Sequence, residues 1–396
     1  RYASRMRQLR ASDIREILKV TQRPEVISFA GGLPAAELLP ATQMAELARD
    51  LLLNDGARAL QYAPTEGLGP LRELIAERLR ERSGVRCTAG EVLVVSGSQQ
   101  ALDLTGKIFL DEGDVVLCES PTYLGAINAL RACAPRFVEV PTDGDGMVPT
   151  ELEKRLAAEQ RARLIYVVPD FQNPSGRRWS LQRRQALAGI AARFGVPVVE
   201  DAPYAELCFE GEPMPPVASL AEEATVIFLG TFSKILAPGL RLGWVVAEPD
   251  IVRRYVLAKQ GADLHTSSLT QLLAARFITE CDLEGHIETL RAVYRRRRDA
   301  MLAALDAHLP GGVRFMRPAG GLFLWLELPD GLDARDLLER CLEKNVAFVP
   351  GGAFFANGGH DNTFRLNFSA MPEERIAEGV RRLAGVLEEI LAPTPA

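Results

Sequence analysis

The sequence predicts an α/β fold with three layers, in which a mainly parallel sheet carries helices on both faces of a large domain. A smaller α+β domain is expected from the N- and C-terminal segments. Between residues 92 and 247, short apolar runs alternate with helical patterns, and after Pro249 this alternation gives way to long helices. A chain of 396 residues that is 47% hydrophobic is also too long for one simple core.

The segment before the sheet contributes helices and one short strand. The expected elements are a helix at 4–19, a strand at 27–30 and helices at 40–53 and 70–82. The sequence Asn54-Asp-Gly56 is expected to end the second of these helices. The stretch Gly31-Gly-Leu-Pro34 is expected to form a tight passage of the backbone.

The central segment supplies the sheet. Strands are expected at 92–95, 115–119, 137–140, 164–168, 196–200, 226–229 and 242–247, with helices at 99–109, 123–132, 150–157 and 181–194. Helices at about 249–260, 269–280 and 284–309 and strands near 321–327 and 364–368 should follow. We place the N-terminal helix and the segment that joins the small domain at 1–50, the large domain at 51–285 and the small domain at 286–396.

Composition excludes several classes of partner. The net charge of −6 is mild and scattered, which argues against nucleic acid or an anionic membrane surface. The basic run Arg295–Arg298 lies in a helical pattern and is expected to be a solvated helix face. Six cysteines without a CxxC pair or Cys/His cluster indicate reduced thiols in a cytoplasmic protein without bound metal. No apolar run reaches transmembrane length, and no signal peptide is evident.

The most informative stretch is 225–244. Two apolar runs enclose a polar group formed by Thr231, Ser233, Lys234 and Arg241. A nearby cation and partial desolvation would both favour the neutral lysine, which can attack a carbonyl carbon. For a Ser-Lys pair alone, a surface lysine in a Gly/Pro loop is the ordinary alternative.

Further polar residues follow the expected strands, where ligands gather in open α/β sheets. Ser98 and Gln99 begin a helix after a Gly turn, and their N–H groups suit a phosphate dianion, although a simple capped helix has the same pattern. Asp201 ends an apolar strand, where a carboxylate needs a cation such as a protonated ring nitrogen. Pro203 makes a helix cap a poorer explanation for Asp201.

Three other side chains complete the set. Asn173 lies in a turn after a strand, Tyr123 opens a helix where its ring could stack on a planar ligand, and Arg365 offers a fork that matches a carboxylate. Taken singly, they also read as a loop residue, a core tyrosine and an exposed strand arginine. Together with Lys234 and Asp201, they match the needs of one cofactor, pyridoxal 5′-phosphate.

These residues also carry a resemblance to a known family. The chain resembles the fold-type I pyridoxal-phosphate-dependent aminotransferases of class I/II, and most of all the 2-aminoadipate and kynurenine/aminoadipate branch. The resemblance covers essentially the whole length. Its most specific pieces are Gln172-Asn173-Pro174-Ser-Gly176, Asp201-Ala-Pro-Tyr204, Ser233-Lys234 and Gly239-Leu-Arg241-Leu-Gly243.

The resemblance implies the following roles. Lys234 would carry the cofactor and then shuttle a proton, while Asp201 would pair with the pyridine nitrogen. Asn173 and Tyr204 would hydrogen-bond the ring oxygen, and Tyr123 would stack on the ring. The residues implied at the phosphate are Ser98, Gln99, Ser233 and Arg241. Arg365 would bind the substrate α-carboxylate, helped by Asn173 and the Gly32 backbone.

The resemblance further implies partners and substrates. Tyr62 matches a tyrosine that reaches the phosphate of the neighbouring subunit, which implies a homodimer with shared active sites. Ser12-Asp-Ile-Arg15 matches a substrate-contacting pattern, in which Arg15 would bind a distal carboxylate; a solvated helix residue is the equal alternative. The implied reaction is ping-pong transfer of an amino group from a 2-aminoadipate-like L-amino acid, with aromatic and branched-chain amino acids as possible further donors, to 2-oxoglutarate.

Two other functions stay open at this stage. A β-lyase or decarboxylase could use the same cofactor site, although two arginines favour a dicarboxylate substrate. The sensing domain of a transcription regulator has this fold too, but it follows a DNA-binding helix-turn-helix, and only thirty residues precede Gly31.

Overall fold

The computed structural model describes Met6 and residues 23–392. Most of the helix expected at 4–19, with Ser12 and Arg15, lies outside the described residues. The large sheet has eight strands in the order β2-β9-β8-β7-β6-β3-β4-β5. They are β2 (Val92–Val95), β3 (Val115–Ser120), β4 (Arg136–Asp143), β5 (Gly146–Met147), β6 (Ala162–Val167), β7 (Val198–Asp201), β8 (Val226–Thr231) and β9 (Gly243–Val246).

Most neighbouring strands of this sheet run parallel. The parallel pairs are β4 with β3, β3 with β6, β6 with β7 and β7 with β8. The strand β9 is antiparallel to both β8 and β2, and β5 is antiparallel to β4. The prediction of a mainly parallel sheet is therefore confirmed.

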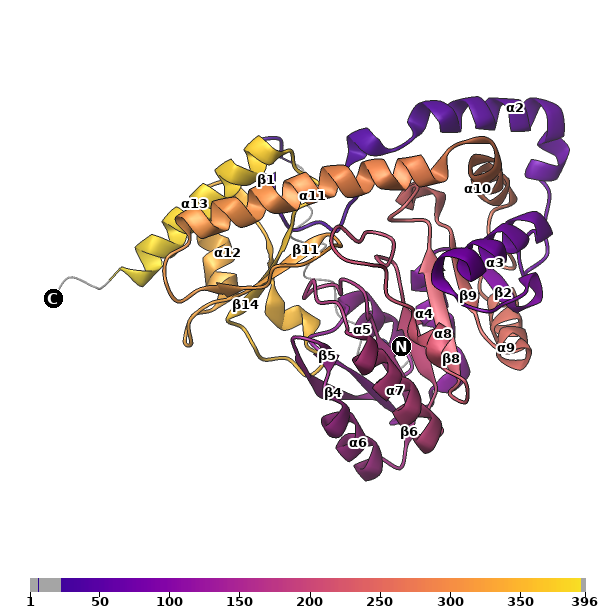
Figure 1. Cartoon of the computed structure of the whole chain (residues 1–396), viewed down its shortest axis with the longest axis horizontal. Coiled ribbons are helices and arrows are strands. Elements are labelled where there is room, and N and C mark those ends of the chain that lie inside the picture. The colour runs from indigo at the N-terminus through magenta and orange to yellow at the C-terminus, as the bar shows by residue number, and fades with distance from the viewer. Residues whose placement is uncertain (1–5, 7–22, 393–396) are drawn as a thin grey trace.

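Helices cover both faces of the sheet because successive side chains of each strand point to opposite faces. On β3, Val116 and Cys118 pack with α4 (Ser98–Phe109) and α5 (Leu124–Arg131), on the same face as α9 (Pro249–Gln260). Val115 and Leu117 pack instead with α6 (Pro149–Ala158), α7 (Leu181–Phe194) and α8 (Val217–Leu220). A third apolar cluster joins β2 and β9 to α2 (Ala41–Ala59), α3 (Gly69–Ser83) and α10 (Ser268–Glu280). Figure 1 shows these helices on the same side of the molecule as β2 and β9.

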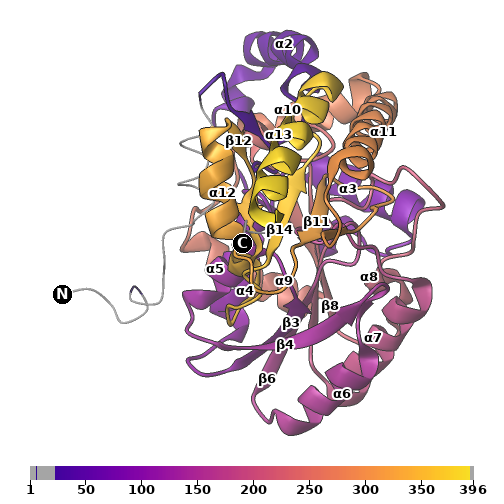
Figure 2. The same cartoon turned by 90° about the vertical axis from the view of Figure 1, so that its left-hand side faces the viewer.

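A smaller α+β part lies beside the large sheet (Figure 2). Its antiparallel sheet has the order β10 (Arg314–Phe315), β11 (Phe323–Glu327), β14 (Thr363–Asn367) and β13 (Val349–Pro350). The N-terminal strand β1 (Ile27–Ser28) pairs in parallel with β12 (Val346–Ala347), which confirms that both ends of the chain build this part. The long helix α11 (Leu283–His308) joins the two parts and packs along α13 (Glu373–Leu391), and α12 (Ala334–Glu343) lies nearby.

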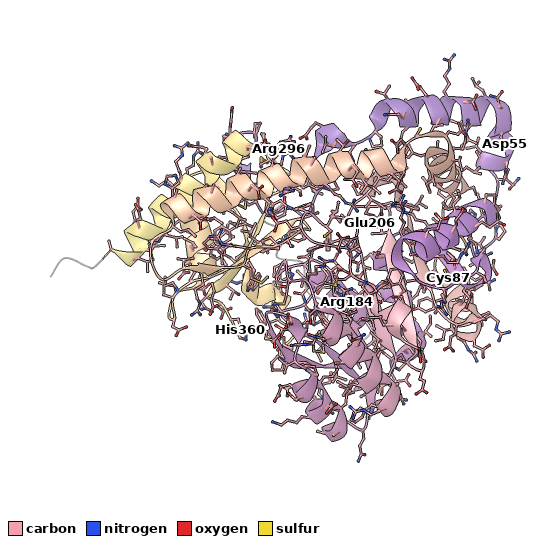
Figure 3. The ribbon with its side chains drawn as sticks, in the orientation of Figure 1. Asp55, Cys87, Arg184, Glu206, Arg296 and His360 are labelled. Carbon is pink, nitrogen blue, oxygen red and sulfur yellow. The ribbon has the colours of Figure 1, made fainter. Side chains whose placement is uncertain are left out.

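Two details of the sequence-based description were wrong. The helix α2 does not end at Asn54–Gly56: Asp55 breaks the helical backbone with φ −137° and ψ 30°, but the helix continues to Ala59. Figure 3 labels Asp55 at this end of α2. The basic run on α11 is only half solvated, because Arg297 and Arg298 are buried and paired with Glu37 and Glu210.

The remaining short elements are 3-10 helices. They occupy Ala36–Leu38, Ala89–Glu91, Pro238–Leu240 and Gly351–Phe354. Within the described part of the chain, every helix is too short or too polar to cross a membrane. The six cysteines all lie in the described part of the chain, and no disulfide links them.

Candidate active site

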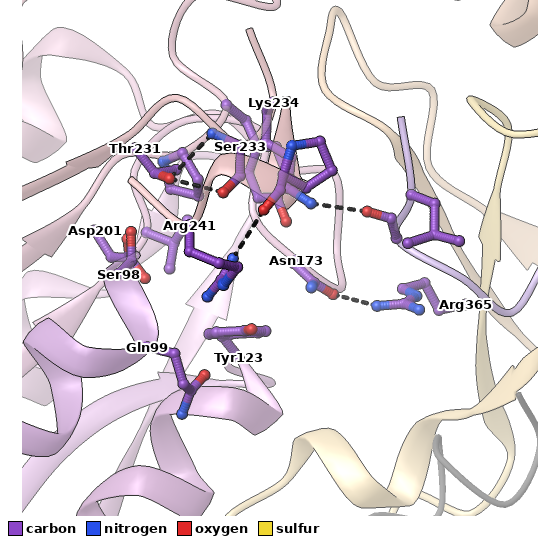
Figure 4. Close-up of a pocket in the computed structure, with 16 residues that line it drawn as sticks. Ser98, Gln99, Tyr123, Asn173, Asp201, Thr231, Ser233, Lys234, Arg241 and Arg365 are labelled. Carbon is purple, nitrogen blue, oxygen red and sulfur yellow. Dashed lines mark hydrogen bonds between the residues drawn. The ribbon is translucent and has the colours of Figure 1, made fainter. Parts of the chain in front are cut away.

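One edge of the large sheet carries a cavity of about 400 Å³. The carboxyl ends of β2, β6, β7 and β8 lead into it, and the antiparallel strand β9 begins there. Figure 4 shows side chains from these strand ends facing Arg365 of the smaller sheet. The predicted site residues that line the cavity are Gly32, Ser98, Gln99, Tyr123, Asn173, Asp201, Tyr204, Ser233, Lys234, Arg241 and Arg365.

The side chain of Lys234 follows the end of β8 and points across the cavity. Its Nζ donates a hydrogen bond to the Gly32 carbonyl oxygen at 2.8 Å. Burial, together with the smaller effect of the Arg365 and Arg241 charges, lowers the pKa of Lys234 from 10.5 to about 8. The expectation of a partly neutral amine is therefore confirmed, with burial as the larger cause.

The turn that carries Lys234 is fixed by Thr231. Its Oγ1 lies 2.8 Å from the Leu242 carbonyl oxygen and accepts a hydrogen bond from the Ser233 N–H at 3.1 Å. The Ser233 hydroxyl also lies 2.9 Å from Thr231 Oγ1. These contacts tie the end of β8 to the start of β9 and orient the lysine between them.

Asp201 ends β7 and is 2% exposed. Its Oδ2 accepts a hydrogen bond from the Tyr166 hydroxyl at 2.9 Å, whereas its Oδ1 is buried without a partner among the described residues. Burial raises the pKa of Asp201 to about 6, and the Tyr166 hydrogen bond only partly opposes this. A buried oxygen without a partner costs about 1–3 kcal/mol, so Asp201 is poised for a donor that a ligand brings.

Tyr166, which donates a hydrogen bond to Asp201, is a candidate site residue that sequence reasoning missed. It sits in an apolar strand, β6, where nothing in the local pattern distinguishes it from a core residue. Its contact with Asp201 depends on the register of β6 against β7, in which Tyr166 lies opposite Val199. That register is a long-range property of the sheet.

The start of α4 forms another part of the cavity wall, through Ser98 and Gln99. The first N–H groups of a helix have no partner within the helix, and they attract anions. The Ser98 Oγ here is buried without a partner among the described residues. Gly97 has φ +82°, and a Cβ added there would lie 2.6 Å from Arg241 Nη2. The turn therefore needs glycine, which lets the guanidinium approach the helix start.

Arg365, on β14, is 2% exposed and forms the far wall of the cavity. Its Nη1 donates to Asn173 Oδ1 at 2.6 Å and its Nη2 donates to the Ala30 carbonyl oxygen at 2.6 Å. The guanidinium also lies over the rings of Phe323 and Phe354, at 4.3 and 5.1 Å from the ring centroids.

The charge of Arg365 has no counter-ion in the described part of the chain. Burial lowers its pKa to about 10, and the nearby Tyr204 and Tyr123 hydroxyls act in the opposite direction. No carboxylate of the described residues lies within salt-bridge distance of it, and its Nε is buried without a partner. A buried guanidinium in this state favours a carboxylate ligand.

Two tyrosines complete the cavity wall. Tyr123 precedes α5 and is half-buried. Tyr204 is 4% exposed, and its ring packs edge-on against the Phe323 ring, with 5.7 Å between the ring centroids. Burial raises the pKa of both phenols, so both remain protonated donors near neutral pH. Tyr62 is different, because it is 78% exposed and does not line the cavity. Its ring packs edge-on against the His265 ring, with 5.6 Å between the ring centroids.

The unpartnered atoms define what fits in the cavity. A planar ring with a protonated nitrogen would supply the donor that Asp201 Oδ1 lacks, and a phosphate on the same ring would suit Ser98 Oγ and Arg241. Figure 4 draws the amine of Lys234 with Asp201 and Ser98 on one side and Arg365 on the other. The donor set therefore fits pyridoxal 5′-phosphate together with a substrate carboxylate.

Comparisons with known proteins agree with this geometry. The family model described as aminotransferase class I and II matches residues 24–383. A 2-aminoadipate transaminase of Thermus thermophilus is 51% identical over 97% of this chain and 96% of that protein. Aromatic-amino-acid aminotransferase 1 of Thermococcus litoralis is 44% identical, over 96% of this chain and 92% of that protein.

A solved structure is similarly close. The α-aminoadipate aminotransferase from Thermus thermophilus, complexed with N-(5′-phosphopyridoxyl)-L-leucine, has a TM-score of 0.92 and 48% sequence identity. The match covers 99% of this chain and 98% of that chain.

Proposed function

We propose that this protein transfers the amino group of 2-aminoadipate-like L-amino acids to 2-oxoglutarate by a ping-pong mechanism. The chain belongs to the class I and II aminotransferases and is a pyridoxal-phosphate-dependent enzyme of amino and 2-oxo acids. Aromatic and branched-chain amino acids are proposed as further donors. The names of the relatives, a 2-aminoadipate transaminase and an aromatic-amino-acid aminotransferase, support this range. The observation that carries the proposal is the placement of Lys234 and the counter-ion-free Arg365 on one cavity.

Several residues would hold the cofactor. Asp201 would keep the pyridine nitrogen protonated, with Tyr166 orienting the carboxylate through its 2.9 Å hydrogen bond. Asn173 and Tyr204 would face the ring oxygen and Tyr123 the ring face. The proposed phosphate ligands are Ser98, Gln99, Ser233 and Arg241. When bound, pyridoxal 5′-phosphate supplies an aldehyde carbon that takes up the amino group and a ring that draws electrons from the substrate carbon.

Lys234 would be the residue that moves the proton. Its pKa of about 8, lowered from 10.5, raises the neutral fraction of the amine near neutral pH, as both a nucleophile and a general base require. The Gly32 carbonyl oxygen, 2.8 Å from Nζ, would hold the amine at the centre of the cavity.

Arg365 would bind the α-carboxylate that amino and 2-oxo acids share. Asn173 and the Ala30 carbonyl oxygen already orient the guanidinium, which reduces the entropy lost on binding. One residue would therefore serve both half-reactions.

The side chain of the substrate and the second subunit involve other residues. We propose that Arg15, with Ser12, binds a distal carboxylate, and that Arg15 moves aside for apolar donors; both residues lie outside the described part of the chain. We further propose a homodimer in which Tyr62 serves the phosphate of the neighbouring subunit. Its 78% exposure and its absence from the cavity lining support a role outside its own subunit.

The deciding experiment is a donor panel with 2-oxoglutarate as acceptor, scored by glutamate formation. We expect 2-aminoadipate to be a preferred donor and parallel lines in double-reciprocal plots at several acceptor concentrations. Glutamate formation from no donor, with pyruvate or glyoxylate accepted instead, would remove 2-oxoglutarate from the proposal. Intersecting lines would contradict the ping-pong mechanism.

The Arg15→Ala variant tests the proposed side-chain contact in separately measured half-reactions. The kcat/KM for 2-aminoadipate should fall about ten- to a hundredfold, as expected for a lost charged contact. The value for leucine, which has no distal carboxylate, should stay nearly constant and serves as the internal control. Equal losses for both donors would show that Arg15 does not recognise the side chain.

A further inference from the structure

A buried lysine lies behind the turn that begins α4. Lys259, near the end of α9, has a side chain that is 0% exposed and does not line the cavity. Its Nζ donates to Gln100 Oε1 at 3.0 Å and to the two carboxylate oxygens of Asp263 at 2.7 and 2.9 Å. All three donors of the ammonium group therefore have acceptors, as a buried charge requires.

Both acceptors of Lys259 also hold Ser96, which directly precedes Gly97. The Ser96 N–H donates to Gln100 Oε1 at 2.8 Å, and the Ser96 hydroxyl donates to Asp263 Oδ2 at 2.9 Å. The Ser96 carbonyl oxygen accepts a hydrogen bond from Arg241 Nη2 at 3.4 Å. Ser96 is thus fixed at its backbone N–H, its side chain and its carbonyl group.

The electrostatics explain why a cation is needed at this point. Gln100 Oε1 and Asp263 Oδ2 both accept hydrogen bonds from Ser96, and two oxygen acceptors that lie close together repel one another. The ammonium group between them removes this repulsion. Burial lowers the pKa of Lys259, but the hydrogen bond and charge of Asp263 act against this and favour the charged form.

We propose that Lys259 is a positioning residue for the cofactor phosphate, acting through Gln100 and Asp263 on Ser96 and hence on the turn at Gly97 and Ser98. The inference rests on the proposed function, since it takes this turn as the phosphate site. Lys259 does not touch the phosphate. It sets the place of the Ser98 hydroxyl and of the first N–H groups of α4.

The Lys259→Met variant tests this in the cofactor-free protein. Methionine has a similar length and leaves no unpaired charge of its own. Dissociation constants are measured by absorbance for pyridoxal 5′-phosphate and for pyridoxal, which has the same ring and aldehyde but no phosphate. We expect the constant for pyridoxal 5′-phosphate to rise about tenfold or more, with little change for pyridoxal.

A matched control is available on α4 itself. Lys107 pairs with Asp103 at 2.6 Å, also four residues away, but its side chain is 49% exposed and lies at the far end of the helix. The Lys107→Met variant should bind both ligands as the wild-type protein does. A selective loss for pyridoxal 5′-phosphate in Lys259→Met alone supports the inference.

Other outcomes overturn it. Equal loss of both ligands in Lys259→Met would mean a general structural role, and unchanged constants would mean no role. If Lys259→Met does not fold, Ser96→Ala decides, because it removes only the hydroxyl, which contacts Asp263 at 2.9 Å and Thr266 at 3.4 Å. It should weaken the binding of pyridoxal 5′-phosphate selectively, and unchanged selectivity would refute the inference. If the wild-type protein binds both ligands equally, the phosphate site itself is wrongly assigned, and the failure then lies in the proposed function.

Discussion

The Asp201→Asn variant should have opposite effects on the cofactor-free and cofactor-bound proteins. The amide has the shape of the carboxylate and can keep the Tyr166 hydrogen bond, so the substitution removes mainly the charge. In the cofactor-free protein this charge is buried and its Oδ1 has no described partner. In the bound protein, we propose that the same charge pairs with the ring nitrogen.

The magnitude follows from the pKa. Burial raises the pKa of Asp201 from 3.8 to about 6, which at about 1.4 kcal/mol per pKa unit corresponds to about 3 kcal/mol. Folding raises the pKa of the Asp201 carboxyl group. Its contribution to the free energy of unfolding is therefore fully present below pH 3.8 and is lost as the pH rises through about 6. Between pH 5 and pH 7.5, the free energy of unfolding of the wild-type protein should therefore fall by about 1–1.5 kcal/mol relative to Asp201→Asn.

Urea unfolding of both cofactor-free proteins at these two pH values measures this difference. A constant penalty from the amide cancels, because only the change with pH is compared. With cofactor, Asp201→Asn should bind about ten- to a hundredfold more weakly, as expected for a lost charged hydrogen bond. Glu200→Gln is the control: Glu200 is buried on the same strand but accepts from Val217 and Ala218 N–H groups, so cofactor affinity should not change.

The same stability difference at pH 5 and pH 7.5 would refute the account of Asp201 as a buried charge. Equal cofactor losses in Asp201→Asn and Glu200→Gln would refute its specific pairing with the ring.

Three other variants test the proposed roles. Lys234→Ala should lose essentially all transamination. In the cofactor-free wild-type protein, the rate of cofactor uptake should rise with pH around a midpoint near 8, the pKa of Lys234. A midpoint near 10 would contradict the lowered pKa. Arg365→Lys should lower kcat/KM about ten- to a hundredfold for amino and oxo acids alike, and a loss confined to one class would show that it does not read the shared carboxylate. Mixing Tyr62→Phe with Lys234→Ala protomers should partly restore activity, because one site of the mixed dimer then carries neither defect. If the mixture is no more active than the two separate variants, each site is complete within one chain.

Much of the site could be predicted because its residues follow strands that the sequence marks clearly. The apolar runs before Ser98, Asp201 and Lys234 are short and bounded by Gly or Pro, so their ends were placed to within a few residues. Parallel strands then bring such ends together at one edge. The proposed domain division at residue 285 stays a prediction, since α11 runs across that position.

Other features depended on contacts that the local sequence does not contain. Asn54-Asp-Gly56 has the composition of a helix end, but α2 resumes beyond its break at Asp55. Arg297 and Arg298 resemble a solvated run because their partners, Glu37 and Glu210, are far away in the sequence. The helices α12 and α13 are missing from the expected elements, although the buried Ile376, Val380, Leu383 and Leu387 of α13 follow a helical period.

The antiparallel strand β9 has a consequence for how this chain can change in length. Because β9 starts beside the end of β8, residues 232–242 both connect the two strands and carry Lys234 and Arg241 to one edge of the sheet. An insertion there would move the amine relative to the guanidinium and would break the contacts of Thr231 with Leu242. The turn between β4 and β5 is free of this constraint, since Gly144 is exposed and nothing lies within 4 Å of a Cβ added there. Peptide tags or fluorescent labels should therefore be tolerated at residue 144, whereas loop grafting between 232 and 242 should abolish activity.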